Sequence, residues 1–173
     1  MANPTMTLIA SVTVGSGGAA TIDFSSIPST YTDLCVKLSA RSTSSTTTVY
    51  SYLILNNNTS NSYAYRRIDG NGSGVVSSSG TSSVGAYTTV TDNATSTSNT
   101  FSNSELYFPN YAGTTNKSIS VDSVTENNGS VANATMWAAS AAITTAINEI
   151  TLVCADGNYT QYSTAYLYGI NNS

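Results

Sequence analysis

The sequence predicts an all-β protein, an antiparallel β-sandwich of jelly-roll type that forms a single domain over residues 1–173. Three observations predict it. Apolar and polar residues alternate with period two in short bursts, helical periodicity is nearly absent, and Asn- and Gly-rich turn signals separate the bursts. About ten short strands with such punctuation are typical of antiparallel sandwiches and jelly rolls.

Eleven segments carry the alternation, and we expect each of them to form a strand. They lie at residues 7–14, 20–24, 32–42, 48–55, 62–68, 84–90, 104–109, 117–126, 132–142, 147–155 and 163–170. Turn signals between them include Asn56-Asn-Asn58 and Asn127-Asn-Gly129. Asn and Gly reach left-handed backbone conformations at low cost, so these short stretches predict hairpin or loop tips.

The segment 73–103 is the least regular part of the chain, because Ser, Thr, Gly and Asn dominate it. We expect a long, outward-projecting loop that carries a weak strand or hairpin. Pro28 predicts a crossing segment and Pro109 a strand end, since proline cannot donate to a ladder. The one helical candidate, 138–146, is disfavoured by its β-branched residues at 143–145.

Charge separates this chain from several functional classes. Charged residues make up 8%, against a usual ~25%, and the net charge is −4. No basic patch is present, which argues against nucleic-acid binding and against electrostatic membrane contact. Residues 1–20 alternate and have no Lys or Arg at their start, so we expect a strand there rather than a signal peptide.

Catalytic equipment is sparse. The chain contains no histidine, so the usual Ser–His and Cys–His nucleophile pairs cannot form. Two scattered cysteines without histidine also cannot make the usual zinc ligand set. Cys35 shares a strand face with Lys37 and is expected to point outward, whereas Cys154 shares a face with Leu152 and is expected inward. We therefore expect two free thiols.

Asp122 and Glu126 alternate to the same strand face, which raises the possibility of a paired-carboxylate site. Glycosidases place two carboxyl groups roughly 5–9.5 Å apart, so one such pair is weak evidence. Nothing in the sequence indicates a pocket that would shift a pKa, and we expect solvated carboxylates rather than an enzyme.

The stretch 69–74, Asp-Gly-Asn-Gly-Ser-Gly, copies the opening of a calcium-binding loop. The acidic residue that should close such a loop is missing, because Gly80 stands where it is expected. A Gly/Asn turn is therefore the favoured interpretation over a calcium site, and no cofactor is expected.

Tyrosine is the most informative residue type, with 12 Tyr against three Phe and one Trp. Tyr has high β-propensity and fills sheet rims, which is the simplest explanation. It is also enriched at interfaces, and the candidates for subunit or capsid contacts are Tyr50, Tyr52, Tyr107 and Tyr111. A third interpretation is a glycan-binding platform, formed by Tyr63, Tyr65, Arg66 and Arg67.

Four segments carry a resemblance to a known kind of protein: residues 7–41, 63–68, 109–117 and 162–170. They include Ile27-Pro-Ser-Thr-Tyr-Thr-Asp-Leu34 and Tyr162-Ser-Thr-Ala-Tyr-Leu-Tyr-Gly-Ile170. This pattern resembles small structural proteins of tailed bacteriophages, most strongly those of marine phages and cyanophages. The resemblance implies a β-sandwich virion component, usually trimeric, that decorates the capsid or forms part of a tail fibre.

From these observations we expect a non-enzymatic virion structural protein. The favoured hypothesis is a capsid decoration, or cement, protein that binds the major capsid protein or other virion proteins as a homotrimer and stabilises the shell. It would be made in the host cytoplasm without a signal peptide. The alternative is a tail-fibre or head-fibre domain that recognises host surface glycans. A secreted carbohydrate-binding module would need an export signal, which we do not expect here.

Overall fold

The structure is a computed structural model that describes residues 5–60, 62–125 and 133–171. Within these residues it contains twelve strands and no helix. The strands are β1 (Met6–Thr13), β2 (Thr21–Phe24), β3 (Asp33–Ala40), β4 (Val49–Leu55), β5 (Tyr63–Gly70), β6 (Val75–Ser82), β7 (Ala86–Thr91), β8 (Ser102–Phe108), β9 (Lys117–Val124), β10 (Ala134–Ala141), β11 (Ile150–Cys154) and β12 (Thr164–Ile170).

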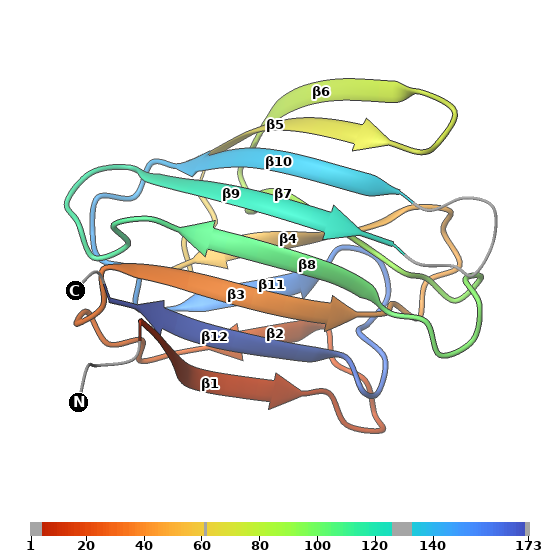
Figure 1. Ribbon diagram of the computed structural model, residues 1–173, viewed down its shortest axis with the longest axis horizontal. Helices are drawn as coiled ribbons and strands as arrows, with labels where there is room; N and C mark the ends of the chain where they lie inside the picture. The colour runs from red at the N-terminus through yellow and green to blue at the C-terminus, as the bar shows by residue number, and fades with distance from the viewer. Residues whose placement is uncertain (1–4, 61, 126–132, 172–173) are drawn as a thin grey trace.

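The strands form two sheets that pack face to face (Figure 1). The larger sheet has eight strands in the order β1-β12-β3-β8-β9-β10-β5-β6, and the smaller has four in the order β2-β11-β4-β7. Every ladder between named strands is antiparallel. The predicted antiparallel β-sandwich is therefore confirmed.

The strand order is that of a jelly roll with two inserted hairpins. The pairs β1–β12, β2–β11, β3–β8 and β4–β7 are nested, with early strands pairing to late ones and alternate pairs falling in alternate sheets. This wrapping of a folded-over chain into two sheets is the eight-stranded jelly-roll arrangement. The hairpins β5–β6 and β9–β10 are additions to it.

Both inserted hairpins extend the larger sheet in the same direction. β9 pairs with β8, β10 with β9, β5 with β10, and β6 forms the final edge, which Figure 1 shows at the top. The larger sheet consequently continues past the smaller one. This extension gives the protein a broad face that the second sheet does not cover.

One hydrophobic core lies between the sheets. Alternate residues of each strand enter it, as in β9, where residues at period two are buried and the intervening ones exposed. Leu34, Leu53, Leu106, Ile150 and Leu152 are fully buried and join strands of both sheets. The alternation that predicts the strands therefore also identifies the core.

All eleven expected strands are present, and the principal correction concerns the segment 73–103. The sequence predicts a long loop that carries a weak strand or hairpin. The structure contains the strand expected at 84–90, which is β7, and a further strand of eight residues, β6. β7 is largely buried, whereas β6 is a sheet edge made mainly of Ser, Thr and Gly. Solvent reaches β6 from more than one side, so its sequence lacks the apolar alternation by which a half-buried strand is recognised.

Several further local expectations agree with the structure, whereas the turn expected at Asn127-Asn-Gly129 lies outside the described residues. Pro109 directly follows β8, and Pro28 lies in the connection between β2 and β3. The helical candidate 138–146 instead continues β10 to Ala141 and then becomes irregular. The expected N-terminal strand is β1, which pairs with β12. Among the described residues, no helix has the length and apolar character needed to span a membrane.

Candidate functional site

The outer face of the larger sheet, which points away from the smaller sheet, is the most distinctive surface of the molecule. Strand register places its side chains in rows that cross the sheet. One row runs through Ile68, Met136, Asp122, Glu105 and Lys37, each opposite the next on neighbouring strands. Residues that lie far apart in sequence therefore meet on one surface.

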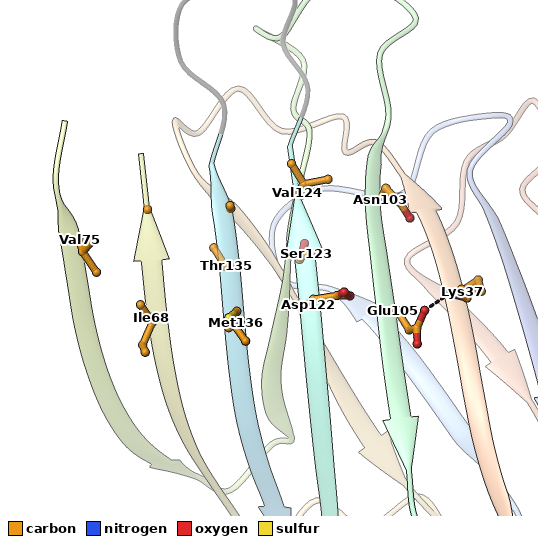
Figure 2. A pocket seen from close by; sticks show the side chains of 12 residues that line it. Lys37, Ile68, Val75, Asn103, Glu105, Asp122, Ser123, Val124, Thr135 and Met136 are labelled. Carbon is orange, nitrogen blue, oxygen red and sulfur yellow. Dashed lines mark ion pairs between the residues drawn. The ribbon is translucent and has the colours of Figure 1, made fainter. Parts of the chain in front are cut away.

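Four large apolar side chains are exposed at one end of this face, and we call them the outer apolar patch. They are Ile68, Val75, Val124 and Met136, with exposed fractions of 53%, 75%, 42% and 67%. Figure 2 shows them on four strands that are neighbours in the sheet, in the order β6, β5, β10 and β9. Single exposed apolar residues are ordinary on protein surfaces, whereas contiguous exposed apolar patches are typical of interaction surfaces.

Small residues make the patch continuous. Val75 pairs with Gly70, Gly70 with Ala134, and Ala134 with Val124. Glycine and alanine raise no side chain above the neighbouring apolar groups. The surface is consequently lower between Val75 and Val124, and it forms part of a shallow hollow there.

Charged side chains border the patch. Lys37 and Glu105 form an ion pair across β3 and β8, which Figure 2 marks with a dashed line. Their side chains are 46% and 40% exposed, so the pair contributes little to stability. Asp122 lies between this pair and Met136 and is exposed. The border therefore carries two carboxylates, Glu105, which pairs with Lys37, and Asp122, which does not.

Two open hollows lie on this face. One of about 420 Å³ is lined by the outer apolar patch together with Lys37, Glu105 and Asp122. A second of about 610 Å³ adjoins it over β5, β6 and β10, and the two share Ile68 and Met136. Together they form a shallow depression across the extended part of the larger sheet. Such a shape suits a protein surface better than an enclosed small molecule.

The four tyrosines expected to make subunit or capsid contacts do not share a surface. Tyr107 lies on the outer face, half-buried, and its phenol Oη donates to Asp33 Oδ2 at 2.6 Å. This hydrogen bond raises the pKa of Tyr107. Tyr111 is fully buried and donates to the carbonyl of Pro28, so the expectation of a contact through Tyr111 is corrected. A side chain enclosed by the core cannot touch a partner.

Tyr50 and Tyr52 lie on β4 and are half-buried. The Tyr50 ring belongs to an aromatic cluster with Tyr65, Tyr87 and Trp137, in which ring centroids lie 5.4–6.2 Å apart. The ring centroids of Tyr52 and Tyr87 lie 5.8 Å apart. These rings fasten the smaller sheet to the inserted strands β5 and β10, so much of their area is used within the molecule.

The expected glycan platform is not formed. Tyr63 is a core residue with 2% exposure, and Tyr65 packs in the aromatic cluster. The guanidinium carbon Cζ of Arg67 lies 5.0 Å from the ring centroid of Tyr50 and 5.1 Å from that of Trp137. Arg66 alone is exposed, on the opposite face of β5. Adjacent strand residues point to opposite faces, and this separates Arg66 from the other three.

Both cysteines are free and buried, which confirms the expectation of unpaired thiols. The expectation that Cys35 points to solvent is wrong. It lies on the same face as Lys37, but its neighbours across the ladders are Tyr107 and Tyr168, and it is only 2% exposed. Cys154 faces the core as expected. Burial raises the pKa of both thiols.

The stretch 69–74 forms the hairpin turn between β5 and β6, as the favoured interpretation predicts. Asn71 Oδ1 accepts hydrogen bonds from the backbone of Ser73 at 3.0 Å and Gly74 at 3.1 Å, and Gly72 has a φ of 81°. Asp69 Oδ2 lies 2.6 Å from Arg67 Nε. Asn71 Oδ1 is thus committed to the turn and Asp69 Oδ2 to the ion pair.

The paired-carboxylate hypothesis can be followed only in part, because Glu126 lies outside the described residues. Asp122 is exposed on the outer face, as expected of a solvated carboxylate. Across the described ranges, no three His, Cys, Asp or Glu residues gather closely enough to hold a metal ion.

No protein-family model matches this chain, and no curated protein or solved structure matches it either. The candidate site is therefore defined by its geometry. Sequence reasoning missed the outer apolar patch, although a signal was present. Met136 and Ile68 occupy the outward positions of strands whose inward positions are already filled by Trp137 and Arg67.

Proposed function

We propose that this protein is a non-enzymatic structural component of a phage particle, a capsid decoration protein that docks on the outer capsid surface. The outer face of the larger sheet is the docking surface in this proposal, and the major capsid protein is the partner. The observation that carries it is the outer apolar patch, whose members are 42–75% exposed and adjoin one another through strand register.

Docking through this face has a clear physical basis. Covering apolar surface stabilises a complex by roughly 25 cal/mol per Å², and specific interfaces bury about 1,200–2,000 Å². The depression lies open on the outer face of the eight-stranded sheet, so docking there requires no change in the fold. The complementary surface would carry apolar side chains opposite Met136 and Ile68 and a basic group opposite Asp122. Repetition over a symmetric shell would multiply a modest contact.

One further observation favours this proposal over the fibre alternative. Jelly rolls build viral capsid domains as well as lectins, so the architecture is compatible with both uses. The residues expected to bind glycans, however, are divided between the core and two faces of β5. The resemblance of the sequence to phage structural proteins agrees with a virion location.

Reconstitution on phage particles tests the proposal. Particles that lack the protein are mixed with the purified chain, and bound copies are counted by quantitative mass spectrometry. We expect hundreds of copies per particle for the wild type and at least a tenfold loss for Met136→Asp. Ser140→Asp is the matched control, because Ser140 is exposed on the same face of the same strand and should bind normally.

Two results would overturn the proposal. Normal incorporation of Met136→Asp would show that the outer apolar patch is not the docking surface. A wild-type count of only a few tens, or none, would exclude a decoration role, and the former would point to a tail component.

A further inference from the structure

The edges of the two sheets differ in how well they are protected against pairing with another chain. Exposed strand edges are aggregation sites unless a bulge, a short strand, a charge or a covering element blunts them. In the described residues, the β1 ladder is interrupted by a register shift between Leu8 and Ala10. β2 has four residues, and β7 is mostly buried and packs against β10.

β6 carries none of these protective features. It has eight residues, Val-Val-Ser-Ser-Ser-Gly-Thr-Ser, without a charge or a proline. It pairs with β5 along its whole length without a register shift. Every residue of β6 is exposed or half-buried, and Figure 1 shows the strand at the margin of the larger sheet. A long, regular and uncharged edge of this kind is suited to accept another strand.

The β5–β6 turn determines which backbone groups β6 presents. The N–H of Asn71 donates to the carbonyl of Gly74 at 3.3 Å, and antiparallel ladders then alternate bonded and non-bonded pairs. Counting from this bond, even-numbered residues of β6 bond to β5. The residues whose N–H and C=O groups point away from β5 are Val75, Ser77, Ser79 and Thr81.

We propose that β6 pairs antiparallel with β6 of a second copy of this chain, about a two-fold axis that passes beside Ser78. Opposed residues must lie on the same face of the joined sheet, so an odd-numbered residue faces an odd-numbered one. Placing the axis at Ser78 sets Val75 opposite Thr81 of the second copy and Ser77 opposite Ser79. This register uses all four outward-pointing residues of each strand.

Side-chain chemistry favours a second copy as the occupant. Neither β6 strand brings a charge, so two identical strands approach without repulsion. Val75 meets Thr81 of the second copy, and both are β-branched residues that favour strands. Val76, which is 56% exposed, would lie opposite Gly80 of the second copy. Because Gly80 has no side chain, the ring of Tyr65 lies over it within the same copy. Pairing therefore places Val76 against an aromatic ring.

The pairing would join two eight-stranded sheets and place their outer faces side by side. Such a contact is isologous and closes as a dimer, whereas the trimer implied by the sequence resemblance needs a contact between two different surfaces. The proposal concerns the free protein and does not depend on the docking partner.

Analytical ultracentrifugation of the full chain tests this inference. The wild-type mass should rise with concentration from 17.9 kDa toward twice that value. Ser79→Pro removes an N–H that β5 does not use and should stay monomeric at every concentration tested. Ser79→Thr keeps that N–H and should dimerise like the wild type. Far-UV circular dichroism verifies that each variant is folded.

Disulfide trapping provides a second readout that does not depend on the proline variant. Ser78 would lie directly opposite itself, at a separation that a disulfide can span. Ser78→Cys should form covalent dimers under mild oxidation at least tenfold faster than Ser120→Cys, an exposed position on β9. The native thiols are buried and should not compete.

A wild-type protein that stays monomeric, or that assembles as a trimer, would overturn the proposal. Equal trapping of Ser78→Cys and Ser120→Cys would also overturn it. Preferential trapping of Ser79→Cys would overturn the assigned register, because that result requires an axis beside Ser79.

Discussion

The phenol oxygen of Tyr63 accepts a hydrogen bond from the backbone N–H of Leu55 at 2.9 Å. The same oxygen donates to the carbonyl of Asn58 at 2.9 Å. Tyr63 begins β5 and Leu55 ends β4, so one side chain fixes the connection between the smaller sheet and the inserted hairpin. This contact helps to position the extension that carries the outer apolar patch.

Tyr63→Phe should destabilise the protein by about 1–3 kcal/mol, because it removes the partner of the buried Leu55 N–H and of the partly buried Asn58 carbonyl. Urea unfolding followed by circular dichroism measures the loss. Tyr166→Phe is the control, since Tyr166 is exposed on β12, and it should change stability by less than about 0.5 kcal/mol. Equal effects of the two substitutions would mean that the Tyr63 contacts carry no special weight.

Arg66 and Arg67 are adjacent in sequence but should respond very differently to truncation. Arg67 stacks on Tyr50 and Trp137 and pairs with Asp69, so Arg67→Ala should cost about 1–3 kcal/mol. Arg66→Ala, on the exposed face of β5, should cost less than about 0.5 kcal/mol.

Fluorescence reports the Arg67 effect locally, because Trp137 is the single tryptophan of the chain. Its emission should shift in Arg67→Ala and stay unchanged in Arg66→Ala. A shift of similar size in both variants would contradict the arrangement in which only Arg67 covers the indole ring.

Local sequence pattern accounts for much of this fold. Strands such as β4 and β9 alternate cleanly because one face meets the core and the other does not, and the sequence records that difference. β6 escaped prediction because neither of its faces is deeply buried. The nested pairing of β1 with β12 and of β2 with β11 is long-range and leaves no mark in local alternation.

Site residues were harder to predict for a related reason. Period two tells which face a tyrosine occupies, but not what covers it. Tyr111 follows β8 in an irregular segment, where no alternation shows that the core encloses it. Cys35 is on the expected face and is nevertheless buried between Tyr107 and Tyr168 of adjacent strands. Cross-strand neighbours decide burial, and they are known only once the register is known.

The close contact between Gly169 on β12 and the ring of Tyr31 requires a residue without a side chain at position 169. A Cβ atom added there would overlap the ring of Tyr31, which lies against the glycine. Gly169→Ala should therefore destabilise the protein by about 1–3 kcal/mol, a drop in Tm of several degrees. Gly15→Ala is the control, because a Cβ there meets no atom within 4 Å. A Tm for Gly169→Ala that equals the Gly15→Ala value would contradict this packing.

Stability should fall at alkaline pH. Burial raises the pKa of the Cys35 and Cys154 thiols and of the phenols of Tyr63, Tyr111 and Tyr159. The unfolded chain therefore releases these protons at lower pH than the folded chain, and between the two pKa values it binds fewer protons. The free energy of unfolding then decreases as pH rises, from about pH 8.5 for the thiols and about pH 10 for the phenols.

Urea unfolding between pH 7 and pH 11 measures this decline. The double variant Cys35→Ala, Cys154→Ala should lose the portion that begins near pH 8.5 and keep the portion that begins near pH 10. The thiols of the wild type should also react slowly with iodoacetamide at pH 8 until the protein is unfolded, because both are buried and protonated. A free energy of unfolding that stays constant or rises above pH 8.5 would contradict the raised pKa values of these thiols and phenols.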